Sequence, residues 1–397
     1  MTLLAARPTE PVDLYSPAID SDPFPLYEAL RERYPAYWSS GGRFWILSRY
    51  DDVARAATDW QTFSSLQGNL VDEIPNRAGG TLGTTDPPRH DRLRALAQAA
   101  FTKKNLDYLV PVILGVAEPA LDRIAAKGSF DFVGEFSAVV TVATIFRLLG
   151  LPERNPLAIR ALVVKSVSTD KARKGRNAEF DAAFAELSGF VSEQVGIRRK
   201  EPRDDLITRL AEAEIDGDRL SEREVILTTS MFVVAGVESL SSFMSMLALN
   251  LTDWPDERAK IIADLALLPQ AIEESLRFNT SAQRFKRTLT RDIEIHGQVM
   301  HAGDYVVLAY GAANRDPRKF TDPDRYDIGR KPQGHLGFGT GKHFCIGSQF
   351  SRLVSDVAMG AFLQRIPHFR RSNADLAWIS SSNFRSPLSL PLQIANS

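Results

Sequence analysis

Residues 338–347, with the sequence FGTGKHFCIG, constrain this chain more than any other stretch, because they hold the only cysteine among 397 residues. A single cysteine forms no intrachain disulfide, so Cys345 is either a packed small hydrophobe or a lone nucleophile or metal ligand. Glycines at 339, 341 and 347 remove side chains around it, which lets a flat and bulky group approach the backbone closely.

The apolar residues after Cys345 recur with a roughly helical period, which predicts a helix that starts at the cysteine. A sulfur at a helix N-terminus lies near the positive end of the helix dipole and near free N–H donors, and both favour the thiolate. These surroundings favour a metal or haem ligand over inert packing.

The pattern F-G-x-G-x-H-x-C-x-G resembles the haem-ligand loop of the cytochrome P-450 superfamily, and every fixed position of that loop is filled here. A pattern with six specified positions is far more specific than a lone glycine motif. The resemblance implies haem b as the cofactor and the Cys345 thiolate as the iron ligand. It also implies that His343 donates to a haem propionate and that Phe338, Gly339 and Gly347 contact the haem.

The length alone would allow two or three domains, but the interior has no linker, repeat or low-complexity run, so a single domain over residues 1–397 is expected. Hydrophobic residues make up 44% and charged residues 24%, as in a globular protein able to enclose a cofactor. The net charge of −1 provides no overall field for nucleic acid or an anionic membrane. Prolines punctuate residues 1–17, so neither a signal peptide nor a membrane anchor is expected, and the single cysteine suits a reducing cytoplasm.

The resemblance implies a mainly α fold: one cytochrome P-450-type helical prism around haem b with a small β-rich lobe. Strands are expected roughly within residues 35–65, 285–310 and 376–394. Helical periodicity dominates residues 106–210. A capping box at Ser221 predicts a helix of about 33 residues that ends at Trp254 and spans roughly 50 Å.

The middle of that long helix is apolar except for Glu238 and Ser239. Glycine inside a helix costs about 1 kcal/mol relative to alanine, so Gly236 reflects either the close approach of a flat ligand or helix packing. The segment resembles the family's A-G-x-(D/E)-T oxygen-binding kink, with serine where threonine is usual. This resemblance puts Ala235 and Gly236 against the haem and implies that Glu238 and Ser239 deliver protons. The Ser239 hydroxyl is expected to bond to the Ala235 carbonyl, and its missing methyl predicts looser control of protons and water.

His90 and Arg94 are four residues apart and share one helical face. Such a pair is usually a solvated face, but here it matches the family's H-x-x-x-R motif, whose members bind the haem propionates. Paired cationic donors suit two buried carboxylates. Arg287 matches a strand arginine with the same role in the family; the alternative is an exposed strand cation.

Glu274 and Arg277 match the family's E-x-x-R motif. A surface pair at this spacing contributes only about 0.2–0.5 kcal/mol, so its position between the long helix and the cysteine loop gives the match its weight. Arg325 is expected to complete a buried ion-pair network with them.

Residues 66–85 form a long, irregular segment, and long loops in compact domains are usually functional or disordered. In the family this stretch roofs the substrate pocket; the alternative is a floppy surface loop. The wall predicted from this loop, the long helix, the segment after Thr280 and the C-terminal tail comprises Leu70, Val71, Ile74, Leu82, Val233, Val234, Val237, Ala282, Gln283, Arg284, Phe285 and Phe384. Its apolar character predicts a small to medium apolar or aromatic substrate, and Arg284 hints at a carboxylate.

The resemblance implies a haem-thiolate monooxygenase, which uses O₂ to hydroxylate or oxidatively dealkylate its substrate. No flavin or nicotinamide motif is present, so electrons are expected from a separate ferredoxin, or flavodoxin, and its reductase. Four basic residues are expected to form the docking patch: Lys342, Arg89, Arg92 and Arg352. We expect a monomer.

Two other functions remain open from the sequence. One is a peroxide-driven or ring-coupling haem enzyme, which the serine at position 239 leaves open. The other is a haem-thiolate sensor or binding protein without turnover. The presence of both Glu238 and Ser239 argues against it.

Overall fold

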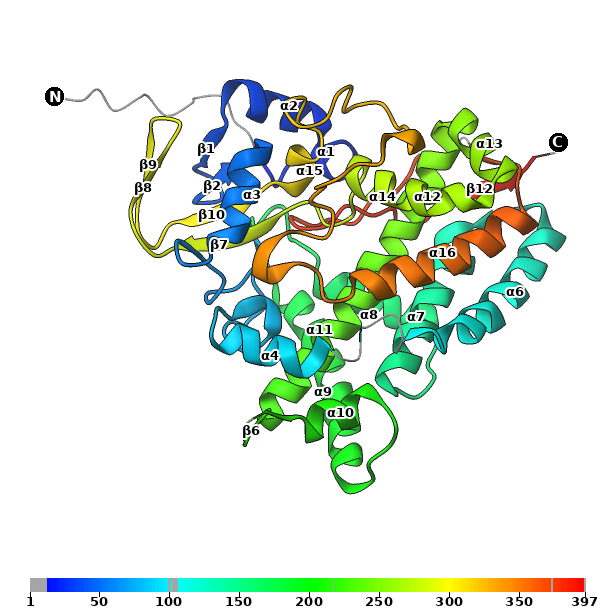
Figure 1. Cartoon of the computed structure of the whole chain (residues 1–397), viewed down its shortest axis with the longest axis horizontal. Helices are drawn as coiled ribbons and strands as arrows, with labels where there is room; N and C mark the ends of the chain where they lie inside the picture. Colours follow the sequence, from blue (N-terminus) through cyan, green and yellow to red (C-terminus); the bar gives the residue numbers. More distant parts are fainter. Residues whose placement is uncertain (1–12, 99–100, 102–105, 216, 373, 396–397) are drawn as a thin grey trace.

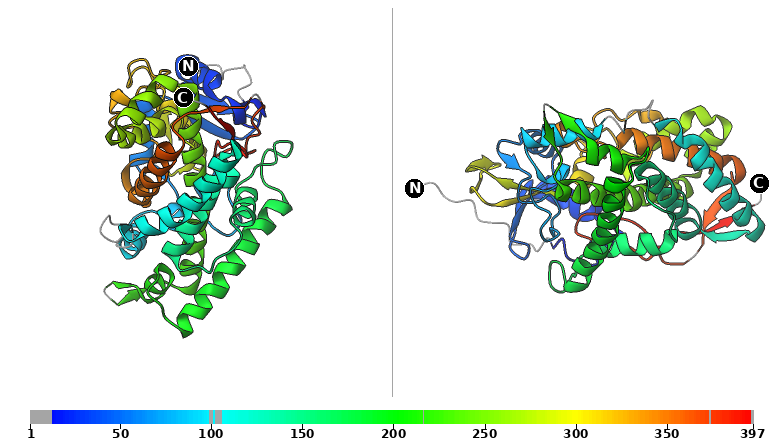
Figure 2. Two further views of the ribbon diagram at one scale, coloured as in Figure 1. Left: turned by 90° about the vertical axis from the view of Figure 1, so that its right-hand side faces the viewer. Right: turned by 90° about the horizontal axis from the view of Figure 1, so that it is seen from below.

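The computed structural model describes residues 13–98, 101, 106–215, 217–372 and 374–395. Figure 1 shows most of the strands gathered at one side of the molecule while helices fill most of the rest; a strand near the C-terminus lies at the opposite side, as the view from below in Figure 2 also shows. The predicted mainly α fold with a small β-rich lobe is therefore confirmed. Most of the N-terminal stretch in which no signal or anchor was expected lies outside the described residues.

Helices account for most of the described chain. In chain order they are α1 (Ala18–Ser21), α2 (Phe24–Arg33), α3 (Tyr50–Thr58), α4 (Arg89–Gln98), α6 (Leu109–Lys127), α7 (Ala138–Leu149), α8 (Pro156–Ser166), α9 (Ala178–Lys200), α10 (Leu206–Glu212), α11 (Glu222–Val234), α12 (Leu240–Asp253), α13 (Pro255–Ala263), α14 (Leu268–Phe278), α15 (Tyr310–Ala313) and α16 (Ser348–Arg365). Short 3₁₀ or π turns are η1 (Leu82–Thr84), η3 (Val133–Ser137), η4 (Ala235–Ser239), η5 (Leu265–Leu267), η6 (Ile328–Arg330) and η7 (Gly341–His343).

The long helix predicted from the capping box runs as α11, η4 and α12 without a break from Glu222 to Asp253. The Ser221 hydroxyl accepts a bond from the Glu224 backbone N–H at 3.3 Å, and the Glu224 carboxylate accepts one from the Ser221 N–H at 2.8 Å. By length and hydropathy this helix could cross a membrane, but 83% of its apolar window is buried inside the protein. It is the central helix of the core, and it packs against α7, α14 and α16.

The strands form one larger sheet and several small ones. Their bounds are β1 (Ala36–Ser39), β2 (Phe44–Leu47), β3 (Phe63–Ser64), β4 (Ser129–Asp131), β5 (Glu214–Ile215), β6 (Asp218–Arg219), β7 (Phe285–Leu289), β8 (Ile293–Ile295), β9 (Gln298–Met300), β10 (Tyr305–Leu308), β11 (Phe369–Arg371) and β12 (Pro391–Ile394). The five-stranded sheet has the order β1-β2-β10-β7-β3, and only its β2–β10 pair is parallel. Pairing of Arg287 with Val306 fixes the position of that arginine on β7.

Two local expectations differ from the structure. Helix α16 starts at Ser348, three residues after the cysteine, because a tight turn carries the chain from Cys345 to the N-cap Gly347. Residues 376–394 contain one strand, β12, and isolated bridges such as Ala282–Phe384. Prolines at 387 and 391 lack the N–H that a longer ladder needs.

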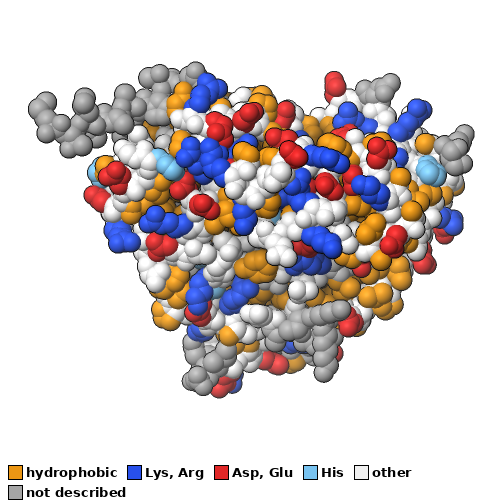
Figure 3. All heavy atoms as spheres, turned by 45° about the horizontal axis from the view of Figure 1, so that its top comes forward, with side chains coloured by type: hydrophobic (Ala, Val, Ile, Leu, Met, Phe, Trp, Pro, Cys, Tyr) orange, Lys and Arg blue, Asp and Glu red, His pale blue; other side chains and the backbone are white. Residues whose placement is uncertain are grey.

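Figure 3 shows one face of the molecule, on which basic and acidic side chains are interspersed. This mixture agrees with the net charge of −1.

Candidate active site

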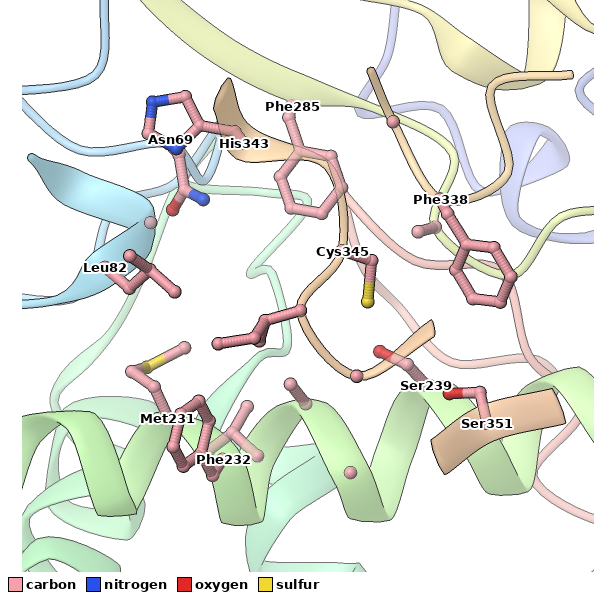
Figure 4. A pocket seen from close by; sticks show the side chains of 18 of the residues that line it. Asn69, Leu82, Met231, Phe232, Ser239, Phe285, Phe338, His343, Cys345 and Ser351 are labelled. Carbon is pink, nitrogen blue, oxygen red and sulfur yellow. The ribbon is translucent and has the colours of Figure 1, made fainter. Parts of the chain in front are cut away.

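A cavity of about 310 Å³ lies between the cysteine loop and the α11–η4 helix. Figure 4 shows the Cys345 sulfur directed into it, with Phe285 on one side and the helix below. Segments distant in sequence meet at this cavity: the 69–83 loop, α4, α11 with η4, β7, the 338–347 loop and Phe384.

The cysteine loop is shaped by backbone bonds. The Cys345 N–H donates to the Phe338 carbonyl at 2.9 Å, which closes the loop on itself. Gly339 and Gly341 both adopt φ of +68°, in the region that favours glycine. A Cβ on Gly341 would also lie 3.0 Å from the Ala57 carbonyl oxygen, so glycine lets the loop pack against the end of α3.

The Cys345 thiol lies in an environment that disfavours its ionised form in the protein alone. Burial raises the pKa of the thiol, while the Gly347 N–H and the charges of Arg94 and Arg352 act in the opposite direction. In the protein by itself, burial therefore outweighs the expected preference for thiolate, although the Gly347 N–H at the start of α16 acts in the predicted direction on the pKa. Coordination to a metal ion deprotonates a thiol outright, so the ionised ligand requires the metal.

Helix α4 presents His90 and Arg94 to the cavity. His90 is fully buried; its Nδ1 lies 2.9 Å from the Asp91 carboxylate, and its Nε2 has no hydrogen-bond partner among the described residues. Arg94 donates to the Phe344 carbonyl at 2.8 Å, so it also braces the cysteine loop.

His343 and Arg287 line the same cavity. The His343 ring lies 4.6 Å from the His90 ring and its Nε2 is 3.2 Å from the Ser65 hydroxyl. Burial lowers the pKa of His343 to about 4, with Asp86 acting in the opposite direction. Arg287 is buried and, within the described residues, its side chain donates to the Lys286 carbonyl alone. The structure thus brings together all four residues that were assigned to the propionates.

The kink in the central helix is a π turn, η4, over Ala235–Ser239. A Cβ on Gly236 would lie 2.7 Å from the Ile145 side chain on α7, so packing between helices accounts for this glycine. Ser239 lines the cavity, and its hydroxyl makes no bond to the Ala235 carbonyl or to any other group in the described part of the chain. The widened turn therefore takes the place of the expected hydroxyl bond.

Glu238 lies next to Ser239 but on the far side of the helix, outside the cavity wall. It accepts a bond from the Ser242 hydroxyl at 2.7 Å and faces Arg160 of α8 at 3.6 Å. Burial raises the pKa of this carboxyl, while Arg160, Ser242 and Ser386 act in the opposite direction.

Half of the predicted pocket residues line the cavity: Leu70, Leu82, Val234, Ala282, Phe285 and Phe384. The other predicted wall residues are buried elsewhere: Val71, Ile74, Val233, Val237, Gln283 and Arg284. Val233 and Val237 belong to the opposite face of the helix, in the hydrophobic core. The Gln283 side chain bonds to Tyr27, and Arg284 donates to the Ser381 carbonyl.

Several wall residues were missed by the sequence reasoning. They include Phe101, Ile145, Thr228, Met231, Phe232, Leu240 and Phe243. Counting back from Ser239 at the helical period gives Ala235, then Met231 and Phe232, then Thr228, so this signal was available. No comparable periodicity exists for the contribution of Ile145.

The E-x-x-R pair is fully buried. Arg277 donates two bonds to Glu274, at 2.7 and 2.8 Å, and further bonds to the carbonyls of Asn314 and Pro323. The prediction for Arg325 is wrong for its side chain, which is exposed; only its carbonyl accepts from Arg277. Arg330 supplies the second guanidinium, 3.1 Å from Glu274.

Comparisons with known proteins identify the family. The cytochrome P450 family model matches residues 135–370. Cytochrome P450 107B1 of Saccharopolyspora erythraea is 34% identical over 365 residues, which are 88% of this chain and 89% of the relative. Cyclomarin C epoxidase of Salinispora arenicola is 33% identical over 372 residues, 91% of this chain and 93% of the relative.

Solved structures show the same fold. Cytochrome P450 CYP109Q5 from Chondromyces apiculatus superposes with a TM-score of 0.86 at 32% identity, covering 97% of this chain and 99% of that one. CYP109E1 from Bacillus megaterium, solved in complex with testosterone, gives 0.88 at 27% identity, covering 96% and 99%.

The fold and the cysteine-centred cavity define a haem-thiolate oxidoreductase. The chain belongs to the cytochrome P450 family, with haem b as its cofactor and O₂ as its co-substrate. The residues fit this cofactor: a cysteine sulfur faces the cavity, while the unpartnered His90 Nε2 and the cations Arg94 and Arg287 suit two carboxylates.

Proposed function

We propose that this protein is a cytoplasmic, monomeric, single-domain monooxygenase that hydroxylates or oxidatively dealkylates a small to medium apolar or aromatic substrate. The observation that carries this proposal is the convergence of Cys345, the cationic side chains and Ser239 on one largely apolar cavity. Bound haem would supply the activation of O₂, because a thiolate ligand to its iron favours O–O cleavage.

Cys345 would hold the iron through its sulfur. Arg94, Arg287, His90 and His343 would bind the two carboxylates of the cofactor. Arg94 has a second task, because its bonds to the Lys342 and Phe344 carbonyls tie α4 to the cysteine loop. Positioning by α4 and β7 together would fix the plane of the cofactor relative to the sulfur.

Glu238 and Ser239 would act one after the other in proton delivery, since only Ser239 borders the cavity. The Ser239 hydroxyl borders the cavity, whereas Glu238 is buried behind it with a raised pKa. A raised pKa lets the Glu238 carboxyl hold a proton nearer to neutral pH, which is suitable for a relay group. A proton passing from Glu238 to the cavity would reach it at Ser239 Oγ.

Electrons would come from a ferredoxin that docks near the cysteine loop. The basic residues proposed for docking are all ion-paired: Lys342 with Asp91, Arg352 with Glu273, and both Arg89 and Arg92 with Glu224. Lys342 is the most direct probe, since its pair with Asp91 is about half exposed at 2.8 Å. We expect Lys342→Glu to slow reduction by the ferredoxin at low salt and much less at high salt. An unchanged rate at low salt would remove this docking patch.

The haem-loaded protein tests the main proposal. Reduced and treated with carbon monoxide, it should show the long-wavelength absorbance maximum of a thiolate-bound haem, and Cys345→Ser should abolish this maximum. With a matched ferredoxin system it should consume NADH and O₂ when substrate is added. Turnover with peroxide alone, and none with NADH, would favour a peroxide-driven enzyme instead.

A further inference from the structure

The end of the cavity formed by α11 and the 69–83 loop carries polar groups in an otherwise apolar wall. Asn69, Arg77, Thr81 and Thr228 all line this end. Figure 4 shows Asn69, Leu82 and Met231 on one side of Cys345 and Ser239 on the other. A substrate reaching from the reacting centre toward α11 would meet these groups at its far end.

Arg77 is 1% exposed, and only part of its guanidinium bonds to oxygen acceptors among the described residues. Its Nε donates to Glu73 at 2.6 Å, and its NH2 donates to Asn69 Oδ1 at 2.6 Å. Its NH1 has a single partner among the described residues, the Met231 sulfur at 3.8 Å, and a thioether is a weak acceptor. One guanidinium nitrogen at the cavity wall therefore lacks an oxygen acceptor.

Thr228 provides a second unpartnered group on the same wall. Its Oγ1 is buried and has no hydrogen-bond partner among the described residues. Thr228 and Met231 are three residues apart on α11 and so share one helical face, and Met231 contacts Arg77 on the wall of the same cavity. A buried donor without a partner is costly, and an acceptor on a ligand would remove that cost.

Arg77 is already paired with a carboxylate, that of Glu73. Arg77 and Lys286 lie close to the carboxylates of Glu73 and Asp72, and Arg176 nearby pairs with Asp181 at 2.7 Å. A ligand carboxylate would add an uncompensated negative charge to a buried site, whereas a neutral carbonyl would not.

We propose that the substrate is an apolar molecule that carries a neutral hydrogen-bond-accepting oxygen, such as a ketone, ester or amide carbonyl, bound by Arg77 and Thr228. This inference rests on the proposed monooxygenase function and names the substrate class of the same cavity. It replaces the carboxylate suggested by Arg284, which does not line the cavity.

The test compares three ligands of one shape: 4-phenylbutan-2-one, 3-phenylpropanoate and 3-methylbutylbenzene. They present a neutral carbonyl, a carboxylate and a hydrocarbon at the same position. Binding to the haem-loaded wild type is measured at neutral pH by calorimetry and by the ferric spin-state shift. The ketone should bind at least about tenfold more tightly than the carboxylate, the consequence of burying an unpaired charge.

Thr228→Val removes the hydroxyl at constant shape. It should weaken ketone binding about fivefold, as expected for one neutral hydrogen bond, and leave hydrocarbon binding unchanged or tighter. Thr229→Val is the matched control: Thr229 is adjacent and buried, its hydroxyl has no partner among the described residues, and it does not line the cavity. It should change neither affinity by more than about twofold. Arg77→Lys, which keeps the charge beside Glu73, should also weaken ketone binding selectively.

Three results would overturn the inference: equal effects of Thr228→Val on ketone and hydrocarbon, a carboxylate that binds as tightly as the ketone, or no saturable ketone binding by the wild type. Each is read from protein that already shows the carbon monoxide maximum of thiolate-bound haem. Absence of that maximum would count against the proposed function instead.

Discussion

The loop around Cys345 is fixed by its own backbone and by Arg94 of α4, whereas the 66–85 loop across the cavity joins local bonds around Glu73 to side-chain bonds from distant segments at Asp72. Cys345 bonds back to Phe338, and the Glu274–Arg277 pair below it is separated by only three residues. Asp72 in the roof instead accepts bonds from Tyr15 at 3.0 Å, Thr169 at 2.7 Å and Ser382 at 2.6 Å.

This difference affects how each region can respond. The bonds of the Cys345 loop to its own backbone and to Arg94 restrict its movement, which suits a fixed metal ligand. The roof depends on a few side-chain bonds between the N-terminal segment, the turn after α8 and the C-terminal tail. Breaking those bonds would release the roof without unfolding the core, and local opening of this kind is typical of segments that admit ligands.

The largest effect is expected on the cysteine side, from Glu274→Gln. This change leaves the Arg277 charge buried without its carboxylate and should lower the free energy of unfolding by about 3–5 kcal/mol. Urea denaturation measures it. Asp122→Asn is the control, because the Asp122–Arg365 pair is more than half exposed and should contribute less than about 1 kcal/mol. Equal losses from both changes would contradict the distinction between buried and exposed pairs.

A smaller effect is expected in the roof, from Asp72→Asn. Loss of the charged acceptor should lower the free energy of unfolding by about 1–3 kcal/mol. Hydrogen exchange should rise in residues 66–85 and remain unchanged in α14. Asp13→Asn, which removes an exposed pair with Lys174, should leave the exchange of the roof as it is. Uniform acceleration over the whole chain would show that the roof does not open separately.

The pH dependence of stability provides a third test on the cysteine side. Glu273 is desolvated, but its bonds to Arg352 and His335 prevail and lower its pKa to about 2. A lowered pKa stabilises the fold above the ordinary carboxyl range and loses that contribution as the pH falls toward the folded value. Glu273→Gln should therefore destabilise the protein by about 1–2 kcal/mol at neutral pH and by less at about pH 3. A difference independent of pH would contradict the ion pair.

The smallest effect concerns Ser239→Thr. The serine hydroxyl is unpartnered in the described part of the chain, and threonine restricts its rotamer. We expect hydrogen peroxide release per NADH consumed to fall about twofold, because a modest preference for one rotamer changes its population by about that factor. Ser281→Thr is a suitable comparison at the cavity wall and should not reduce the leak. If Ser239→Thr leaves the leak unchanged, looser proton control by serine is not supported.

The sequence predicted the groups whose geometry is set locally. The order FGTGKHFCIG contains the glycines that let the loop turn, and the Ser221 capping box starts the central helix where it was expected. Spacing on one helix also identified His90 with Arg94 and Glu274 with Arg277, since residues three or four apart must share a face.

The sequence was least informative where a position depends on neighbours from elsewhere in the chain. Gly236 is explained by Ile145 of α7, and Arg330 takes the place expected for the Arg325 side chain. Burial raises the pKa of the Cys345 thiol, and that burial depends on the segments that pack around the loop.

The sequence by itself determined that this chain has one cysteine in a glycine-rich loop and a long apolar helix, because each pattern depends only on residues close together in the chain. Only the tertiary structure decided which side chains line the cavity, that Glu238 lies behind its wall, and that Arg77 and Thr228 both line the cavity. Those relations depend on packing between segments far apart in the chain, and no local pattern records them.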